Sequence, residues 1–166
     1  MAGDADFSEY VAARWPGLVR SAVLLGCTRP EAEDLVQTTL ERCLVKWGKV
    51  READDRDAYV HRVLINVFIS ARRRRWTGEK PVSDPPERAS RDETAGVDDT
   101  DAMMRALDRL GTDQRTAVVL RYYAHLTDPQ IASVLGVAIG TVKSRLSRAV
   151  KVLAEDPGLA ELRGTR

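Results

Sequence analysis

The chain has 166 residues, a formal net charge of +1 and 43% hydrophobic residues, which suits one globular domain or two small ones. No apolar run approaches the roughly 20 residues of a membrane span, and the acidic start MAGDADFSEY lacks a signal-peptide core, so a cytoplasmic protein is expected. Cys27, Cys43, His61 and His125 are isolated from one another in the sequence. This spacing argues against a metal site and places both cysteines in the core.

The charge is unevenly distributed along the chain. Residues 1–76 carry a net charge of +2, residues 77–101 carry −5, and residues 102–166 carry +4. Two weakly basic blocks with an acidic segment between them favour a nucleic-acid partner, although an ordinary scatter of surface charge gives a similar profile.

Two helices are predicted before residue 50. Residues 6–25 carry an apolar stripe that Pro16-Gly17 interrupts, which predicts a kink or a break. Residues 30–48 show the most regular helical pattern, with Pro30 in the first turn and Gly48 as the expected end. The polar face of this helix holds Asp34, Gln37, Thr38, Glu41 and Arg42. Taken alone, that face is typical of solvated surface.

A charged loop is expected over residues 49–57 and a helix over residues 58–75. The apolar positions of this helix predict an inward face made of Tyr59, Val60, Val63, Leu64, Val67 and Phe68. On its opposite side, Arg62, Asn66 and Arg73 are spaced so that they form one strip.

An arginine run closes this helix. Arg72, Arg73, Arg74 and Arg75 are followed directly by Trp76. One or two cations would serve the helix dipole, whereas four beside a tryptophan suit a nucleic-acid backbone better.

Residues 77–101 contain three prolines and eight acidic side chains, and they predict a flexible linker between two all-helical domains. The expected organisation is a first domain over 1–76, the linker, a second domain over 102–153 and a frayed tail over 154–166.

The second domain begins with predicted helices over 102–110 and from residue 112 to 124. A helix-turn-helix follows over Thr127–Val150, with Thr127 and Gln130 as a capping box and Gly136 in the turn. Val142, Leu146, Ala149 and Val150 are expected to face inward. The outward face carries phosphate and base-edge partners, namely Thr141, Lys143, Ser144, Arg145, Ser147 and Arg148. An ordinary helical hairpin with a solvated basic face is the alternative.

The sequence shows no catalytic constellation: a glycine-rich phosphate loop, a paired histidine and carboxylate, and a nucleophile motif are all missing. Neither a catalytic residue nor a cofactor is therefore expected.

The chain resembles the extracytoplasmic-function (group 4) sigma factors of bacterial RNA polymerase, in particular the actinobacterial SigE-family branch of this sigma-70 group. In the first half the resemblance rests on FSEYVAARWPGLVRSAVLLG, EAEDLVQTTLERCLVKW and AYVHRVLINVFISARRRRW. In the second half it rests on LGTDQRTAVVLRYY and IASVLGVAIGTVKSRLSRA.

This resemblance implies a role for each domain. The first would be sigma region 2, whose face of Asp34, Gln37, Thr38 and Glu41 would dock on the clamp helices of the polymerase's largest subunit. Asn66 would hold a flipped base of the −10 element, Arg62 belongs to the same family pattern, and Arg72 to Arg75 would lie along the DNA backbone. The second domain would be region 4, which would contact the flap of the second-largest subunit and place residues 139–152 in the major groove of the −35 element.

The resemblance also implies that the acidic linker threads toward the RNA-exit path, that the protein has an anti-sigma partner and that it has no enzymatic activity. The lack of a long apolar run predicts no membrane association. The sequence departs from the family at Ala138, where Ser or Thr usually caps the recognition helix, and at Asp128-Pro129-Gln130. Two other classes of function are weighed against a sigma factor, namely a free-standing helix-turn-helix regulator and a small helical enzyme domain.

Overall fold

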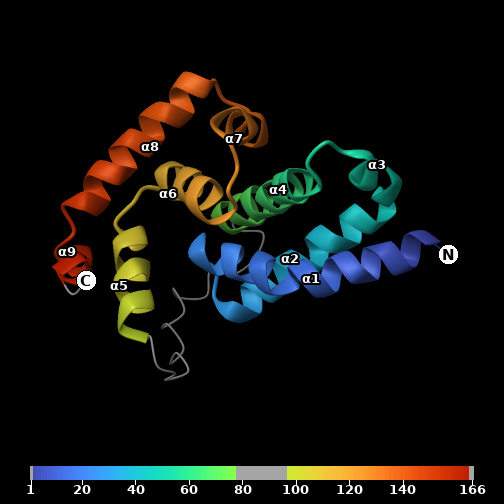
Figure 1. Cartoon of the computed structure of the whole chain (residues 1–166), viewed down its shortest axis with the longest axis horizontal. Coiled ribbons are helices and arrows are strands. Elements are labelled where there is room, and N and C mark those ends of the chain that lie inside the picture. Colours follow the sequence, from blue (N-terminus) through green and yellow to red (C-terminus); the bar gives the residue numbers. More distant parts are fainter. Residues whose placement is uncertain (1, 78–96, 165–166) are drawn as a thin grey trace. The chain divides into compact units, whose positions relative to one another are not determined.

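The computed structural model describes residues 2–77 and 97–164, and every regular element in these ranges is helical. The chain divides into two compact units, of which the N-terminal one contains α1 to α4 and the C-terminal one α5 to α9 (Figure 1). The predicted all-helical class with two domains is therefore confirmed. Most of the expected linker, residues 78–96, lies outside the described residues.

The N-terminal unit is built from α1 (Ala2–Leu24), α2 (Arg29–Val45), α3 (Trp47–Glu52) and α4 (Arg56–Trp76). Its core lies where α2 packs on α4, with Val36, Val60, Leu64 and Ile65 completely shielded from solvent. Thr28 begins α2 with a capping box, in which Glu31 accepts a hydrogen bond from the Thr28 amide at 3.0 Å.

A kink or a break is predicted at Pro16, and the break does not occur, because α1 continues through it. A proline inside a helix costs about 3 kcal/mol, but residues on both sides of it are buried against the rest of the unit. Tyr10 precedes the proline, and Leu18, Val19 and Ala22 follow it. The packing of both halves of α1 offsets the lost backbone hydrogen bond.

The predicted charged loop over 49–57 is only partly correct, because α3 occupies its first residues and Gly48 lies inside that helix. Trp47 is the reason. Its ring is buried, its Nε1 donates to Asp6 Oδ2 at 3.2 Å, and Phe7 meets it edge-on at a centroid distance of 5.1 Å. Val50, three residues later, has no exposed surface. Two apolar anchors one turn apart thus turn a polar stretch into a short helix.

The C-terminal unit consists of α5 (Val97–Asp108), α6 (Thr112–Val118), the π-helical turn η1 (Val119–Tyr123), α7 (Asp128–Leu135), α8 (Ile139–Ala154) and α9 (Pro157–Gly164). Helix α5 thus begins inside the segment expected as linker. The core lies between α6, α7 and α8, where Ile131 and Val142 have no exposed surface.

The expected frayed tail is instead helix α9, which packs on α5. Asp156 begins this helix, because its Oδ1 accepts hydrogen bonds from the amides of Gly158 at 2.9 Å and Leu159 at 3.4 Å. Its other oxygen pairs with Arg109 Nη1 at 2.8 Å. A capped start and an ion pair to the preceding part of the unit explain why the chain stays helical here.

Candidate nucleic-acid interface

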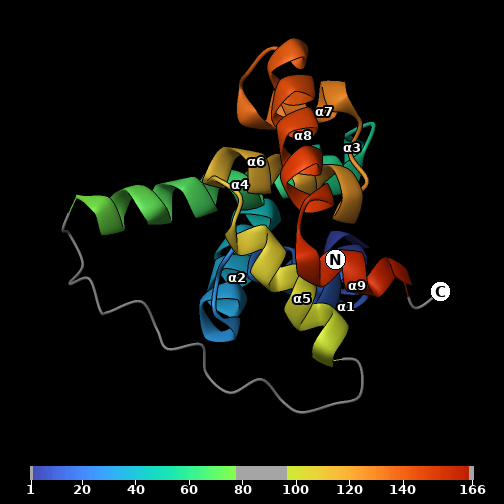
Figure 2. The same cartoon turned by 90° about the vertical axis from the view of Figure 1, so that its left-hand side faces the viewer.

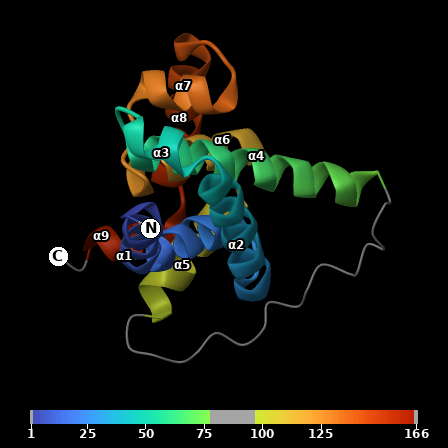
Figure 3. The same cartoon turned by 90° about the vertical axis from the view of Figure 1, so that its right-hand side faces the viewer.

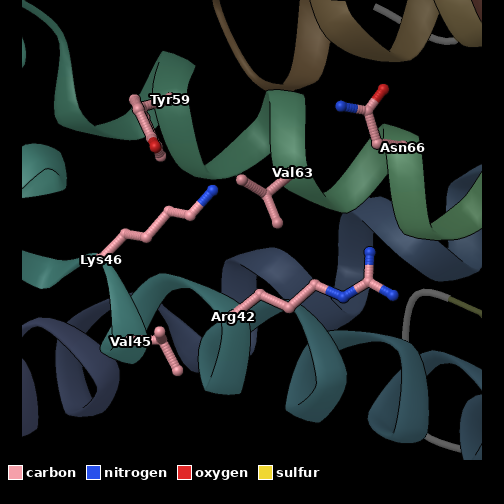
Figure 4. Close-up of a pocket in the computed structure, with 6 residues that line it drawn as sticks. All are labelled: Arg42, Val45, Lys46, Tyr59, Val63 and Asn66. Atoms are coloured by element: carbon pink, nitrogen blue, oxygen red, sulfur yellow. The ribbon is translucent and has the colours of Figure 1, made fainter.

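A groove lies between α2 and α4 on the surface of the N-terminal unit (Figure 4). Its volume is about 310 Å³, which is at the lower end of the range for small-molecule sites. Six residues line it: Arg42, Val45 and Lys46 from α2, and Tyr59, Val63 and Asn66 from α4. Figure 4 shows the cationic ends of Arg42 and Lys46 reaching toward the α4 side of the groove.

The groove combines three kinds of contact in one place. Tyr59 offers an aromatic face, Asn66 offers an amide with both donors and an acceptor, and two cations lie across from them. Tyr59 and Val63 are half-buried rather than part of the closed core, so their predicted inward position is only partly correct. Arg62 is exposed on α4 but does not line the groove.

The arginine run occupies the last turns of α4, which Figures 2 and 3 show running out beyond the crossing with α2. The four side chains are exposed, but they are not equivalent. The Arg72 guanidinium lies 5.5 Å from the centre of the Phe68 ring, and Arg75 Nη2 lies 2.6 Å from Glu31 Oε1. Trp76, at the end of the run, is 90% exposed.

The polar face predicted on α2 is present as a continuous strip. Asp34, Gln37 and Glu41 are exposed and Thr38 is half-buried. Gln37 Nε2 donates to Glu41 Oε1 at 3.3 Å, which holds these two side chains side by side. Arg42 lies next to this strip and lines the groove, so α2 presents an acidic and amide face beside a cationic one.

The helix-turn-helix of the second unit forms as the sequence predicts. The Thr127 hydroxyl accepts from the Gln130 amide, and the Gln130 side chain accepts from the Thr127 amide at 2.8 Å, which completes the capping box. Gly136 ends α7 at a φ of 67°, a left-handed conformation in which glycine avoids a Cβ clash. Ala138 precedes α8 without a side-chain hydrogen bond.

Helix α8 points most of its predicted DNA-binding residues into solvent. Thr141, Lys143, Ser144, Ser147 and Arg148 are exposed. Arg145 differs, because its side chain is 24% exposed and its Nη2 lies 3.6 Å from Asp113 Oδ2 of α6. Val142, Leu146 and Ala149 are buried as predicted, but Val150 is 43% exposed and its predicted inward position is wrong, because the buried stripe is already complete without it.

Some residues of these surfaces escape prediction from the sequence alone. The sequence places Arg42 only on the polar face of its helix and gives no role to Val45 and Lys46, although Arg42 and Lys46 are four apart, at the spacing of neighbours on one helix face. Val45 is 84% exposed, and Ile139, the first residue of α8, is 43% exposed. The signal in the sequence that could have indicated these residues is an apolar side chain on the polar face of a predicted helix, or two cations spaced four residues apart.

Comparisons with known proteins match both units. Residues 13–77 match the family model of sigma-70 region 2, and residues 100–153 match that of sigma-70 region 4. The RNA polymerase sigma-E factor of Streptomyces coelicolor is 37% identical over 151 residues, which cover 91% of this chain and 85% of that protein. The chain belongs to the ECF RNA polymerase sigma factors. It therefore recognises promoters as a subunit for transcription initiation, and it is not a free-standing regulator.

Other relatives place this sigma factor in the same group. The ECF RNA polymerase sigma factor SigL of Mycobacterium tuberculosis is 34% identical over 155 residues, which cover 89% of this chain and 84% of that protein. Among solved structures, the sigma factor RpoE in complex with the anti-sigma factor NepR from Bartonella quintana matches with a TM-score of 0.76 and 30% identity, over 90% of this chain and 95% of that one. CnrH in complex with the cytosolic domain of CnrY shares the fold, with a TM-score of 0.63.

None of the helices in the described ranges is long and apolar enough to cross a membrane.

Proposed function

We propose that this sigma factor binds core RNA polymerase through α2, opens promoter DNA at the −10 element with α4, and reads the −35 element with α8. The observation that carries the proposal is the groove between α2 and α4, because it joins Asn66 to an aromatic ring and two cations. Such a combination of ring, amide and cations suits an unpaired nucleotide.

The groove meets the needs of a base that has left the duplex. Extrusion of a base costs a few kcal/mol of lost stacking and pairing, which the protein must replace. The Tyr59 ring can stack on the base, the Asn66 amide can pair with its polar edge, and Arg42 can neutralise a neighbouring phosphate.

The arginine run continues this path along the DNA. Arg73 and Arg74 project from the last turns of α4 and can each neutralise a phosphate, together with Arg62 on the same helix. Trp76 offers a further exposed ring beside them. These contacts carry no sequence information, but they hold the strand while the base is in the groove.

Polymerase binding is assigned to the strip of Asp34, Gln37, Thr38 and Glu41 on α2. Asp34, Gln37 and Glu41 are exposed, and Gln37 donates a hydrogen bond to Glu41. The strip is acidic, which suits a basic partner surface, and the clamp helices of the largest subunit are proposed to supply it. Since Arg42 belongs to the groove, one helix would carry polymerase on one side and DNA on the other. The C-terminal unit is proposed to contact the flap of the second-largest subunit.

The −35 element is assigned to the outward face of α8, where Lys143 and Arg148 reach phosphates or guanine edges and Thr141, Ser144 and Ser147 supply short polar contacts. Arg145 is the least exposed of these cations and lies 3.6 Å from Asp113, so it is less available for DNA than Lys143 and Arg148.

Neither unit has a large positive charge, since residues 1–76 carry +2 and residues 102–166 carry +4. Weak binding of free DNA follows from so few phosphate contacts. Tight binding requires that core polymerase hold both units at the spacing of the two promoter elements, so that the second contact becomes intramolecular.

We also infer an anti-sigma partner and a non-enzymatic role. Support for the partner comes from the matched RpoE structure, which was solved with the anti-sigma factor NepR. The role is non-enzymatic because binding and base extrusion account for the proposed site residues, while nucleotide polymerisation belongs to core polymerase.

The proposal is tested by transcription with purified core polymerase on a library of genomic promoters. The expected result is co-purification with core and initiation at a defined subset of promoters that share two elements. A protein that neither binds core nor directs initiation would refute the proposal.

A further inference from the structure

The first turn of α8 exposes a large apolar side chain that no assigned role uses. Ala138, Ile139, Gly140 and Thr141 are all exposed, and 43% of Ile139 is open to solvent. Elsewhere in the helix-turn-helix, Ile131 and Val142 have no exposed surface. Ile139 is therefore an apolar residue at the tip of the element that reads DNA.

Its neighbours leave Ile139 as the dominant side chain of this turn. Ala138 precedes it with a single methyl, and Gly140 follows it with no side chain at all. A Cβ built at Gly140 meets no atom within 4 Å, so open space surrounds the turn on that side. Two small residues leave room for the helix end to approach a base pair closely, and Ile139 is the large apolar side chain of this turn.

The position of Ile139 in the motif determines what it can reach. In a helix-turn-helix, the N-terminal residues of the second helix contact base edges in the major groove. The Ile139 side chain has no hydrogen-bond donor or acceptor, so it distinguishes bases only by apolar contact. The apolar group that a base pair presents in the major groove is the C5 methyl of thymine.

We infer that Ile139 is a specificity-determining residue that selects a thymine in the −35 element by covering its C5 methyl. This inference rests on the proposed function of α8, and it adds an apolar term to contacts that are otherwise polar. A contact that buries one methyl group is expected to change affinity about fourfold.

Thymine and deoxyuridine provide the direct test, because they differ only by the C5 methyl and pair identically. Holoenzyme is assembled from core polymerase and the full chain, and its −35 element is first selected from a promoter library. Each thymine of either strand in that element is then replaced singly by deoxyuridine, and holoenzyme binding is measured. One replacement is expected to weaken wild-type holoenzyme about fourfold and to leave the Ile139→Ala holoenzyme unaffected.

Val150 supplies the matched control, since it is also 43% exposed on α8 but lies about 16 Å farther along the helix. Val150→Ala holoenzyme should keep the full response to deoxyuridine, and Ile139→Val should keep part of it.

Three outcomes would overturn the inference: a selected −35 element without thymine, wild-type binding that ignores every replacement, or an equal loss for Ile139→Ala on both DNAs. The last outcome would mean that Ile139 serves the fold or a protein partner. Failure of the holoenzyme to initiate at any promoter would instead refute the proposed function itself.

Discussion

Arg75 and Glu31 form an ion pair of 2.6 Å that joins the end of α4 to the start of α2. Glu31 uses its other oxygen to accept the Thr28 amide of its own capping box. Burial alone would raise the pKa of Glu31, but the hydrogen bonds from Thr28 and Arg75 outweigh it and hold that pKa below its ordinary value. One of the four arginines assigned to DNA is therefore already engaged within the protein, and a phosphate must compete with Glu31 for it.

Glu31→Gln should release Arg75 for DNA while keeping the cap, because a glutamine oxygen can still accept the Thr28 amide. The free energy of unfolding should fall by at most about 1 kcal/mol, since Arg75 is exposed and Glu31 is only half-buried. Holoenzyme binding to promoter should gain one phosphate contact, so its salt slope should steepen by about 0.7–0.9. The measurement is promoter affinity over a series of salt concentrations.

Glu33→Gln is the control for this experiment, because Glu33 pairs with Arg29 of its own helix at 3.3 Å and not with the arginine run. It should leave the salt slope unchanged. An unchanged slope for Glu31→Gln would show that the ion pair does not limit DNA binding.

Asn66→Ala should lower formation of the open promoter complex about 10- to 100-fold, because the extruded base loses polar partners worth about 1–3 kcal/mol. Core binding should not change, since Asn66 lies on α4 and the proposed polymerase strip lies on α2. The readouts are open-complex formation on a set of −10 variants and core affinity.

Arg62→Ala offers a contrast on the same helix, because Arg62 is exposed outside the groove. It should weaken all promoters alike, whereas Asn66→Ala should lose preference for one base. If Asn66→Ala lost core binding, the assignment of the polymerase contact to α2 would be wrong.

Glu41→Arg should weaken core binding by tenfold or more, because like charges placed together at an interface cost several kcal/mol. Gln37→Ala should have a smaller effect, since it removes a hydrogen bond of about 1 kcal/mol. Both side chains are exposed, so the unfolding free energy should stay nearly constant. Core affinity is measured by titration, with Asn66→Ala as the variant expected to bind normally. Undiminished affinity in both α2 variants would remove the clamp-helix assignment.

The helix-turn-helix could be predicted because its determinants are local. Thr127, Gln130 and Gly136 act on residues within one turn of themselves, and each takes the predicted conformation. The sigma-factor resemblance, which the comparisons confirm, added roles that local rules cannot supply. The individual contacts to polymerase and DNA remain predictions.

The groove and α3 could not be predicted because they depend on contacts between distant residues. Periodicity places Tyr59 and Val63 on an apolar face, but it does not show that the packing of α2 leaves both side chains partly exposed to solvent. Likewise, Trp47 pairs with Asp6 and Phe7 across a sequence gap that no helical period spans. Arg145 reads as a free cation in the sequence, and only folding brings it to Asp113.

His61 should make the stability of the N-terminal unit depend on pH. It is buried, its Nδ1 lies 2.8 Å from the Asp57 carbonyl oxygen, and burial lowers its pKa. In the unfolded chain the pKa of His61 is about 6.5, so below this pH the unfolded chain binds a proton that the folded chain, with its lower pKa, does not yet bind. The contribution of His61 to the free energy of unfolding is therefore fully present above pH 6.5. It is lost as the pH falls below this value, by at most about 1.4 kcal/mol per pH unit.

Urea unfolding of the N-terminal unit between pH 7.5 and 5.5 would measure this slope. His61→Gln can keep a donor toward the Asp57 carbonyl but does not titrate, so its stability should change less over the same range. Parallel slopes for the two proteins would contradict the assignment of the pH dependence to His61.

Gly140→Ala should affect stability and promoter binding in opposite directions. Its added methyl meets no atom within 4 Å in the free protein, and alanine restricts the unfolded chain, so the unfolding free energy should rise by about 0.4–1 kcal/mol. The same methyl would stand between the first turn of α8 and the base pairs, so holoenzyme binding to the −35 element should weaken.

Gly48→Ala is the matched control, because its Cβ also meets open space but lies in α3 of the other unit. It should stabilise the chain without loss at the −35 element. Undiminished promoter binding by Gly140→Ala would show that the first turn of α8 does not approach the bases closely.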